Sequence, residues 1–222
     1  KMSKSKGNVI NPDDIVKEFG ADTLRVYEMF MGDYEQDSPW STDSLRGCKR
    51  FIDKIIRLKN KVIDKEEYSK SLEGIITKSI KKVEYDLNHL GYNTAVSTLM
   101  ILANKYEEQE EITKKDYQVL LTLLNPIAPH ITEELNAYLG YSPICESTWP
   151  KYDEEKTIDK DVTIGVQVNG KLRGEINVSK EESEEEIKQK ALANENVKRH
   201  LENKEIVKMI VVKGKIVNIV VK

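Results

Sequence analysis

The spacing of the apolar residues changes once along this chain of 222 residues, shortly before Val162. Up to that point apolar residues recur about every 3.6 positions, which predicts amphipathic α-helices. From Val162 onward they alternate with small or polar residues, which predicts β-strands with one buried face. We therefore expect a multi-domain protein, mainly helical, that ends in a small α+β domain.

Turn residues and shifts in composition predict four segments. A basic loop with connecting helices is expected over 1–44, and amphipathic helices with short connections predict a bundle over 45–150. A charged stretch without periodicity predicts a linker over 151–161. Two hairpins around one helix predict a ββαββ domain over 162–222.

Capping residues predict where the helices begin and end. Asn11 followed by Pro12 begins the first helix, Gly20 ends it, and Asp22 or Thr23 is expected to cap the second. The other starts are expected at Ser41 or Thr42, near Ser71, at Asn93, and at Thr113 with Asp116 as a capping box. Two prolines, at 126 and 129, predict a break before the last helix of the bundle.

The final domain has stronger local signals than the bundle. Asn169-Gly170 lies between two alternating runs and predicts a tight hairpin, because both central residues of such a turn need positive φ. A helix is expected over 181–193. The runs 206–212 and 216–221 flank Lys213-Gly214 and predict the second hairpin.

Composition limits the classes of function. Hydrophobic residues make up 39% and charged residues 33%, which is typical of a folded, charge-rich protein. No apolar run reaches the roughly 20 residues that a membrane span needs. Cys48 and Cys145 are far apart and form no CxxC pair, so neither a disulfide framework nor a metal site is predicted. We expect a cytoplasmic protein with no membrane partner.

The chain starts with a basic loop, Lys1-Met2-Ser3-Lys4-Ser5. Ammonium groups on a short Ser/Gly loop suit phosphates that gain negative charge in a transition state. The alternative is a solvated Lys/Ser tail, and composition alone favours it.

Two further groups of cations could bind nucleic acid, although the formal net charge is −3. The first lies on the helix expected after residue 41 and the second beside the two hairpin turns of the final domain. The candidate residues are Arg46, Lys49, Arg50, Arg57, Lys171, Arg173, Lys213 and Lys215. A solvated helix face and lysines that protect strand edges are the alternatives.

Several of these segments resemble a known family. The sequence of residues 1–5 is similar to the second signature of class I aminoacyl-tRNA synthetases. The continuation through 11–14, 20–25 and 39–41 resembles their branched-aliphatic subgroup, and 27–32 with 166–174 resembles the bacterial leucyl-tRNA synthetases. The resemblance covers essentially the whole chain.

This resemblance implies activation of leucine with ATP and Mg²⁺, followed by transfer to tRNA(Leu), by a monomer. By the matching positions, Lys4 would contact ATP phosphates with Lys1 assisting, while Met2, Ser3 and Ser5 complete the ATP-binding loop. The helical part would be the anticodon-binding bundle and the final domain would grip the corner of the tRNA. The family's nucleotide-binding fold is missing from the chain, so catalysis in isolation is not expected.

Two rivals remain. Another synthetase of the subgroup would end differently, with a Cys-rich zinc module in isoleucyl relatives and a coiled coil in valyl relatives. A stand-alone tRNA-binding or scaffold protein would carry the basic loop as a vestige.

Overall fold

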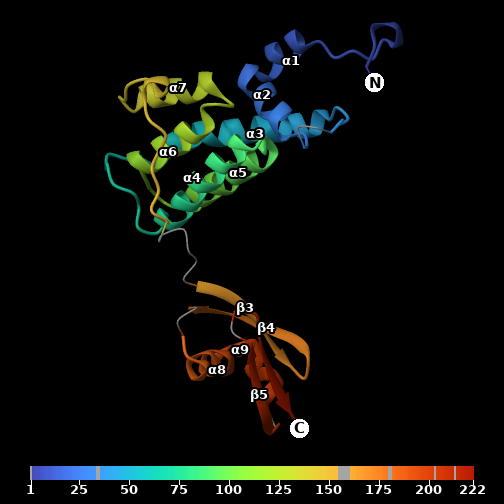
Figure 1. Cartoon of the computed structure of the whole chain (residues 1–222), viewed down its shortest axis with the longest axis vertical. Coiled ribbons are helices and arrows are strands. Elements are labelled where there is room, and N and C mark those ends of the chain that lie inside the picture. Colours follow the sequence, from blue (N-terminus) through green and yellow to red (C-terminus); the bar gives the residue numbers. More distant parts are fainter. Residues whose placement is uncertain (1, 34–35, 155–160, 180–181, 203, 213) are drawn as a thin grey trace. The chain divides into compact units, whose positions relative to one another are not determined.

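The computed structural model describes all residues except 1, 34–35, 155–160, 180–181, 203 and 213. The chain divides into two compact units, Lys1–Thr157 and Ile158–Lys222. Figure 1 shows that the first unit consists of helices and the second of a sheet with two helices. The predicted fold class, a mainly helical part followed by a small α+β part, is confirmed. Within the described ranges, every helix is too short or too polar to span a membrane.

The first unit contains seven α-helices among its described residues. They are α1 Pro12–Phe19, α2 Ala21–Phe30, α3 Thr42–Leu58, α4 Glu73–Asn88, α5 Tyr92–Glu107, α6 Lys114–Leu124 and α7 Pro129–Tyr138. Short 3-10 turns are η1 Lys4–Lys6, η2 Lys59–Lys61 and η3 Ile144–Glu146. A two-residue parallel pairing joins β1 Val62–Ile63 to β2 Ile112–Thr113, and the sequence analysis did not foresee it.

Most helix ends follow local capping chemistry as predicted. The Asn11 side chain accepts a hydrogen bond from the Asp13 amide at 3.2 Å, and Gly20 ends α1 with φ 91°. Ser41 caps α3, and Thr113 forms the expected capping box with Asp116. These predicted caps are confirmed. They could be predicted from the sequence because each cap depends only on residues within one helical turn.

Two predicted caps are wrong. The second helix begins at Ala21 with Gly20 before it, so Asp22 and Thr23 lie inside α2 rather than capping it. The fifth helix begins at Tyr92, because the Ala95 amide already donates to the Gly91 carbonyl at 3.0 Å. Asn93 is therefore a helical residue. Asp22 does not cap α2, because its carboxylate forms hydrogen bonds with a segment more than 100 positions away.

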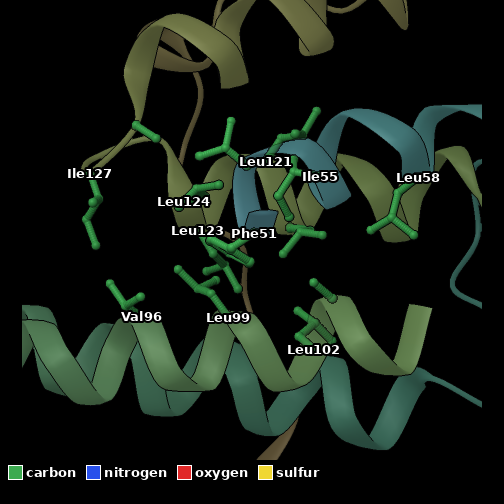
Figure 2. Packing of buried hydrophobic residues seen from close by; sticks show 14 of the residues in the cluster. Phe51, Ile55, Leu58, Val96, Leu99, Leu102, Leu121, Leu123, Leu124 and Ile127 are labelled. Atoms are coloured by element: carbon green, nitrogen blue, oxygen red, sulfur yellow. The ribbon is translucent and has the colours of Figure 1, made fainter. Parts of the chain in front are cut away.

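The core of the first unit lies where α3, α5 and α6 meet. Figure 2 shows Phe51 and Ile55 of α3 pointing toward the same space as Leu99 of α5 and Leu124 of α6. All four side chains are at most 5% exposed. Burying a side chain of this size contributes about 1.5–3 kcal/mol, so apolar packing is the main stabilising term of the bundle.

A charged group is also buried in this unit. Asp116 has 0% exposure, and its carboxylate accepts from the Ser69 amide at 3.1 Å, the Ser69 hydroxyl at 2.5 Å and the Thr113 amide at 3.0 Å. The buried Tyr106 hydroxyl donates to the Asp116 carbonyl at 2.9 Å. These hydrogen bonds replace the water that the carboxylate loses on burial and tie the start of α6 to the segment before α4.

The second unit is a four-stranded sheet with strand order β4-β3-β6-β5. Its elements are β3 Asp161–Val168, β4 Lys171–Ser179, α8 Glu184–Ala193, α9 Glu195–Leu201, β5 Ile206–Val212 and β6 Ile216–Val221. The two hairpins are antiparallel, and β3 pairs with β6 in parallel. Helix α9 was not predicted. Asn194 ends α8 in an extended conformation and caps α9 by accepting from the amides of Asn196 and Val197.

The first hairpin turn also fixes the centre of the sheet. Asn169 and Gly170 have φ of 48° and 78°, which confirms the predicted turn. The Asn169 side chain donates to the Val221 carbonyl at 3.1 Å and accepts from the Val221 amide at 2.9 Å. The turn thus continues the pairing of β3 with β6 beyond the end of β3.

Candidate functional site

The basic loop closes on itself through one side chain. The Ser3 amide donates to Oδ1 of Asn8 at 2.8 Å, the Lys6 amide donates to the Ser3 carbonyl at 3.1 Å, and the hydroxyls of Ser3 and Ser5 lie 3.2 Å apart. Gly7 has φ 63°, a conformation that favours glycine. Asn8 was missed by the sequence analysis, although an Asn beside a Gly is a common signal of a turn.

The loop is open to solvent. Met2 is 43% exposed, and Ser5, Lys6, Gly7 and Asn8 are also exposed. The backbone of Lys4 begins η1, whereas Lys1 lies outside the described residues. Surfaces that bind highly charged phosphates need exposed donors, and the loop provides them without burial inside the bundle.

The cations predicted on α3 have acidic neighbours. Arg46 pairs with Asp43 at 3.3 Å and Lys49 with Asp53 at 2.8 Å, both within one helical turn. Arg57 lies 3.5 Å from Glu107 of α5. Among the predicted α3 cations, Arg50 alone has no ion pair to a described residue.

Glu107 is the acidic centre of this face. Its carboxylate is also 2.6 Å from Lys54 of α3, and hydrogen bonding by Lys54 and then Arg57 lowers the pKa of Glu107. A cavity of about 460 Å³ lies between α3 and α5, and Arg50, Arg57 and Glu107 contribute to its lining. The face is therefore a mixed-charge surface rather than a continuous basic one.

The cations of the second unit are split between two places. Lys171 is exposed at the first position of β4, and Arg173 is the extra residue of a bulge opposite Val166 and Gln167. Lys215 is exposed in the turn before β6, and Lys213 lies outside the described residues. Because the first turn bonds to the end of β6 and Lys215 precedes its start, the structure does not bring Lys215 together with Lys171 and Arg173.

Comparison with known families places the chain in one of them. A family model described as the anticodon-binding domain of tRNA ligase matches residues 69–189, more than half of the chain. A second model, tRNA synthetases class I (I, L, M and V), matches residues 1–41. The chain therefore belongs to the family of anticodon-binding domains of class I tRNA ligases.

Individual relatives narrow this class. The leucine–tRNA ligase of Alkaliphilus oremlandii (strain OhILAs) is 52% identical over an alignment of 223 residues, covering 100% of this chain and 28% of that protein. A crystal structure of a ternary complex of the agnB2 LeuRS of Agrobacterium radiobacter K84 with tRNA and LeuAMS superposes with a TM-score of 0.72. Its sequence is 28% identical, and the match covers 100% of this chain and 32% of that one. The chain is a homologue of leucine–tRNA ligase that spans about a third or less of the length of these relatives.

Proposed function

We propose that this chain is the part of a leucine–tRNA ligase that supplies the second ATP signature loop and the tRNA-binding surfaces. The whole ligase activates leucine with ATP and Mg²⁺ and transfers it to tRNA(Leu), acting as a monomer in the cytoplasm. The similarity of all 222 residues to a leucine–tRNA ligase at 52% identity carries this proposal. The ligase activity is assigned to the complete protein and not to this segment alone.

The loop contributes cations to the activation step. Lys4, assisted by Lys1, would hold the ATP phosphates while pyrophosphate leaves the adenylate, and Met2, Ser3 and Ser5 would complete the ATP-binding loop. An ammonium group is a compact point charge that can follow the moving phosphate. The bond from the Ser3 amide to Asn8 supports this role because it closes the loop around Lys4. Mg²⁺ would arrive on the ATP phosphates, which are its usual ligands.

The tRNA-binding surfaces would contact the RNA backbone rather than its bases. On α3, Arg50 has its guanidinium available, while Arg46, Lys49 and Arg57 must exchange exposed carboxylate partners for phosphates. Such exchange costs little, because exposed ion pairs contribute roughly 0–1 kcal/mol. In the second unit Lys171, Arg173, Lys213 and Lys215 would form two separate phosphate contacts.

The activation role is tested by leucine-dependent exchange of pyrophosphate into ATP, in the complete natural protein that carries this chain. Lys4→Ala should lower kcat by about a hundredfold or more, the typical cost of losing one aligned electrostatic donor. Lys6→Ala is the matched control, because this lysine is exposed on the same loop but follows the signature. Equal losses in both variants, or exchange that does not need leucine, contradict the proposal.

The tRNA-binding role is tested by the salt dependence of tRNA affinity. Lys171→Glu with Arg173→Glu should weaken binding and reduce the slope of log K against log salt by about one per lost phosphate contact. Lys198→Glu with Arg199→Glu makes the same charge change on exposed positions of α9 and should leave the slope nearly unchanged. The same slope change in both double variants would show a general charge effect instead.

A further inference from the structure

The position of the signature loop depends on α2. The loop leads into α1, which contains no fully buried residue, and α1 joins α2 at Gly20 without an intervening loop. Among the described side chains, those of α2 are the first along the chain to be completely buried, since Val26 and Tyr27 are 0% and 1% exposed. Any rotation or sliding of α2 on the bundle would therefore move α1, from which residues 7–11 lead to the loop.

Two polar side chains of α2 hold one distant segment. The Arg25 guanidinium donates through Nε to the Ile127 carbonyl at 2.8 Å and through Nη2 to the Pro126 carbonyl at 3.4 Å. One carboxylate oxygen of Asp22 accepts from the Ile131 amide at 2.7 Å, and the other lies 2.8 Å from Nδ1 of His130. We call these four contacts the α2 ties.

The segment needs these partners because it interrupts the helical ladder. Helix α6 ends at Leu124 and α7 starts at Pro129, and proline has no amide hydrogen. Helix α7 has no side-chain cap of its own, so the Ile131 amide in its first turn would be unpaired. The Asp22 carboxylate supplies the missing acceptor and places a negative charge at the positive end of the helix dipole. Asp22 is 7% exposed, so without these donors its charge would be buried alone.

Resting on the proposed function, we infer that Asp22 and Arg25 are positioning residues of leucine activation, because the α2 ties set the angle at which the signature loop leaves the bundle. Apolar packing alone is non-directional and leaves a helix free to rotate slightly. Hydrogen bonds from Asp22 and Arg25, on successive turns of α2, to three backbone atoms and one side chain of the distant segment remove that freedom. A misplacement of about 1 Å at a catalytic group can lower the rate by about a hundredfold, so the ties affect chemistry without touching ATP.

A distance measurement tests the geometry. Spin labels are placed on Glu18→Cys in α1 and Ile101→Cys in α5, two exposed positions, after Cys145→Ser, while the buried Cys48 stays unlabelled. The distance distribution should be narrow in the parent protein and broader in Asp22→Ala and Arg25→Met. Asp22→Asn should show intermediate broadening, because its amide oxygen can still accept from the Ile131 amide. Glu28→Gln, an exposed change on the same helix, should leave the distribution unchanged.

Kinetics of the complete ligase test the consequence. Asp22→Ala and Arg25→Met should lower kcat of leucine-dependent exchange by about tenfold to a hundredfold, with KM for leucine and tRNA affinity unchanged. Arg25→Lys should recover part of kcat. If an alanine or methionine variant fails to fold, Asp22→Asn and Arg25→Lys are compared by the same two readouts.

Unchanged distance distributions overturn the inference, as do broadened distributions with parental kcat. Absence of leucine-dependent exchange in the parent would instead refute the proposed function, and the distance measurement would still decide the structural claim about the ties.

Discussion

The two units specify their structures by different means. The helical unit buries three carboxylates, those of Asp22, Asp86 and Asp116, together with polar side chains such as Thr132 and Asn136. In the described part of the sheet unit, every fully buried side chain is apolar. Helices that pack through apolar stripes can slide or rotate, so directional bonds between them select one arrangement. A sheet needs fewer such bonds, because its ladder and its turns already fix the register.

The two units also differ in how much core they contain. The buried cluster of the first unit draws on α2 to α7, whereas that of the second contains only eleven fully buried residues among those described. Small domains bury a smaller fraction of their surface and are correspondingly marginal. Loss of one contact should therefore deform the bundle locally but unfold the sheet unit as a whole. Both tryptophans, Trp40 and Trp149, lie in the first unit, so their fluorescence reports on that unit alone.

The largest expected effect is the difference in reactivity between the two thiols of the helical unit. Burial raises the pKa of Cys48 to about 11, and its side chain is 1% exposed, whereas Cys145 is exposed. At pH 8 an alkylating reagent should modify Cys145 at least about a thousandfold faster, since Cys48 reacts only when the bundle opens. Mass spectrometry of timed samples measures both rates. Comparable rates would mean that the bundle opens readily and that its buried polar groups do not hold its helices in one arrangement.

Removal of the Asp116 carboxylate should be the most destabilising single change in the bundle. Asp116→Ala leaves the amides of Ser69 and Thr113 without their acceptor, and hydrogen bonds to a charged group contribute about 1.5–3 kcal/mol each. We expect a loss of about 4 kcal/mol in the free energy of unfolding, measured by urea titration of tryptophan fluorescence. Glu110→Ala, an exposed change in the loop before α6, should cost less than about 0.5 kcal/mol. Similar midpoints for the two variants would contradict a specifying role for Asp116.

Ile219→Ala tests whether the loss of one buried side chain unfolds the whole sheet unit. Ile219 is 0% exposed on β6, and truncation of a buried isoleucine costs about 2–5 kcal/mol. In a unit with so small a core we expect loss of the whole β-sheet signal, while tryptophan fluorescence follows the parental titration. Ile210→Ala is the control, because Ile210 is 42% exposed on the edge strand β5. If amide exchange showed that β3 to β6 remain protected in Ile219→Ala, the sheet unit would tolerate a cavity without unfolding. Its stability would then be greater than the size of its core indicates.

These contrasts explain which features the sequence could predict. The Thr113 capping box, the end of α1 at Gly20 and the Asn169-Gly170 turn depend on neighbours within a few positions, and all were predicted correctly. The role of Asp22 was missed because its partners lie more than 100 residues away. The pairing of β1 with β2 was missed for a related reason, since two residues carry no periodicity and their partners are 50 positions apart.

The features of the candidate site also divide into those that adjacent residues predict and those that depend on distant partners. The signature loop was recognisable from five adjacent residues, but its closure by Asn8 requires the folded backbone. On α3 the basic residues were evident from their spacing. The pairing of Lys54 and Arg57 with Glu107 was not, because that carboxylate comes from α5 and meets them only when the two helices pack.

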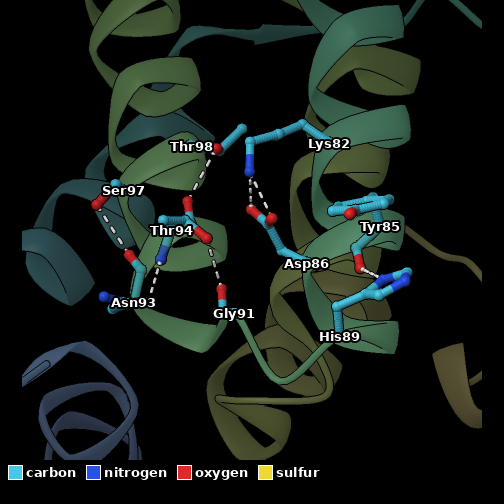
Figure 3. Close-up of polar contacts among 9 residues, drawn as sticks. All are labelled: Lys82, Tyr85, Asp86, His89, Gly91, Asn93, Thr94, Ser97 and Thr98. Carbon is cyan, nitrogen blue, oxygen red and sulfur yellow. Dashed lines mark hydrogen bonds and ion pairs between the residues drawn. The ribbon is translucent and has the colours of Figure 1, made fainter. Parts of the chain in front are cut away.

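The smallest predicted effect is the change in stability when a residue with positive φ is replaced. The two units differ in the type of residue that they place at such a position. Among the described residues other than glycine, the sheet unit places Asn169 at positive φ, 48°, whereas the helical unit places Leu90 there with φ 59°. Figure 3 shows the turn between His89 and Gly91, where the Thr94 hydroxyl donates to the Gly91 carbonyl at 2.8 Å. The Gly91 amide donates to the Asp86 carbonyl at 2.8 Å, after the end of α4. A left-handed conformation costs a residue with a side chain about 1–2 kcal/mol, and Leu90 is 48% exposed, so little apolar contact offsets that cost.

Leu90→Gly should therefore stabilise the bundle by about 0.5 kcal/mol, since part of the relieved strain is offset by the greater entropy of glycine in the unfolded chain. Leu90→Ala keeps the strain and should not stabilise. Gly91→Ala should destabilise, because its Cβ would lie 3.0 Å from Oγ1 of Thr94 and 3.4 Å from Asp86. Paired urea titrations followed by tryptophan fluorescence measure all three. If Leu90→Gly lowered the midpoint, the Leu90 side chain would contribute more to packing than its exposure indicates, and the bundle would not carry strain that the sheet unit avoids.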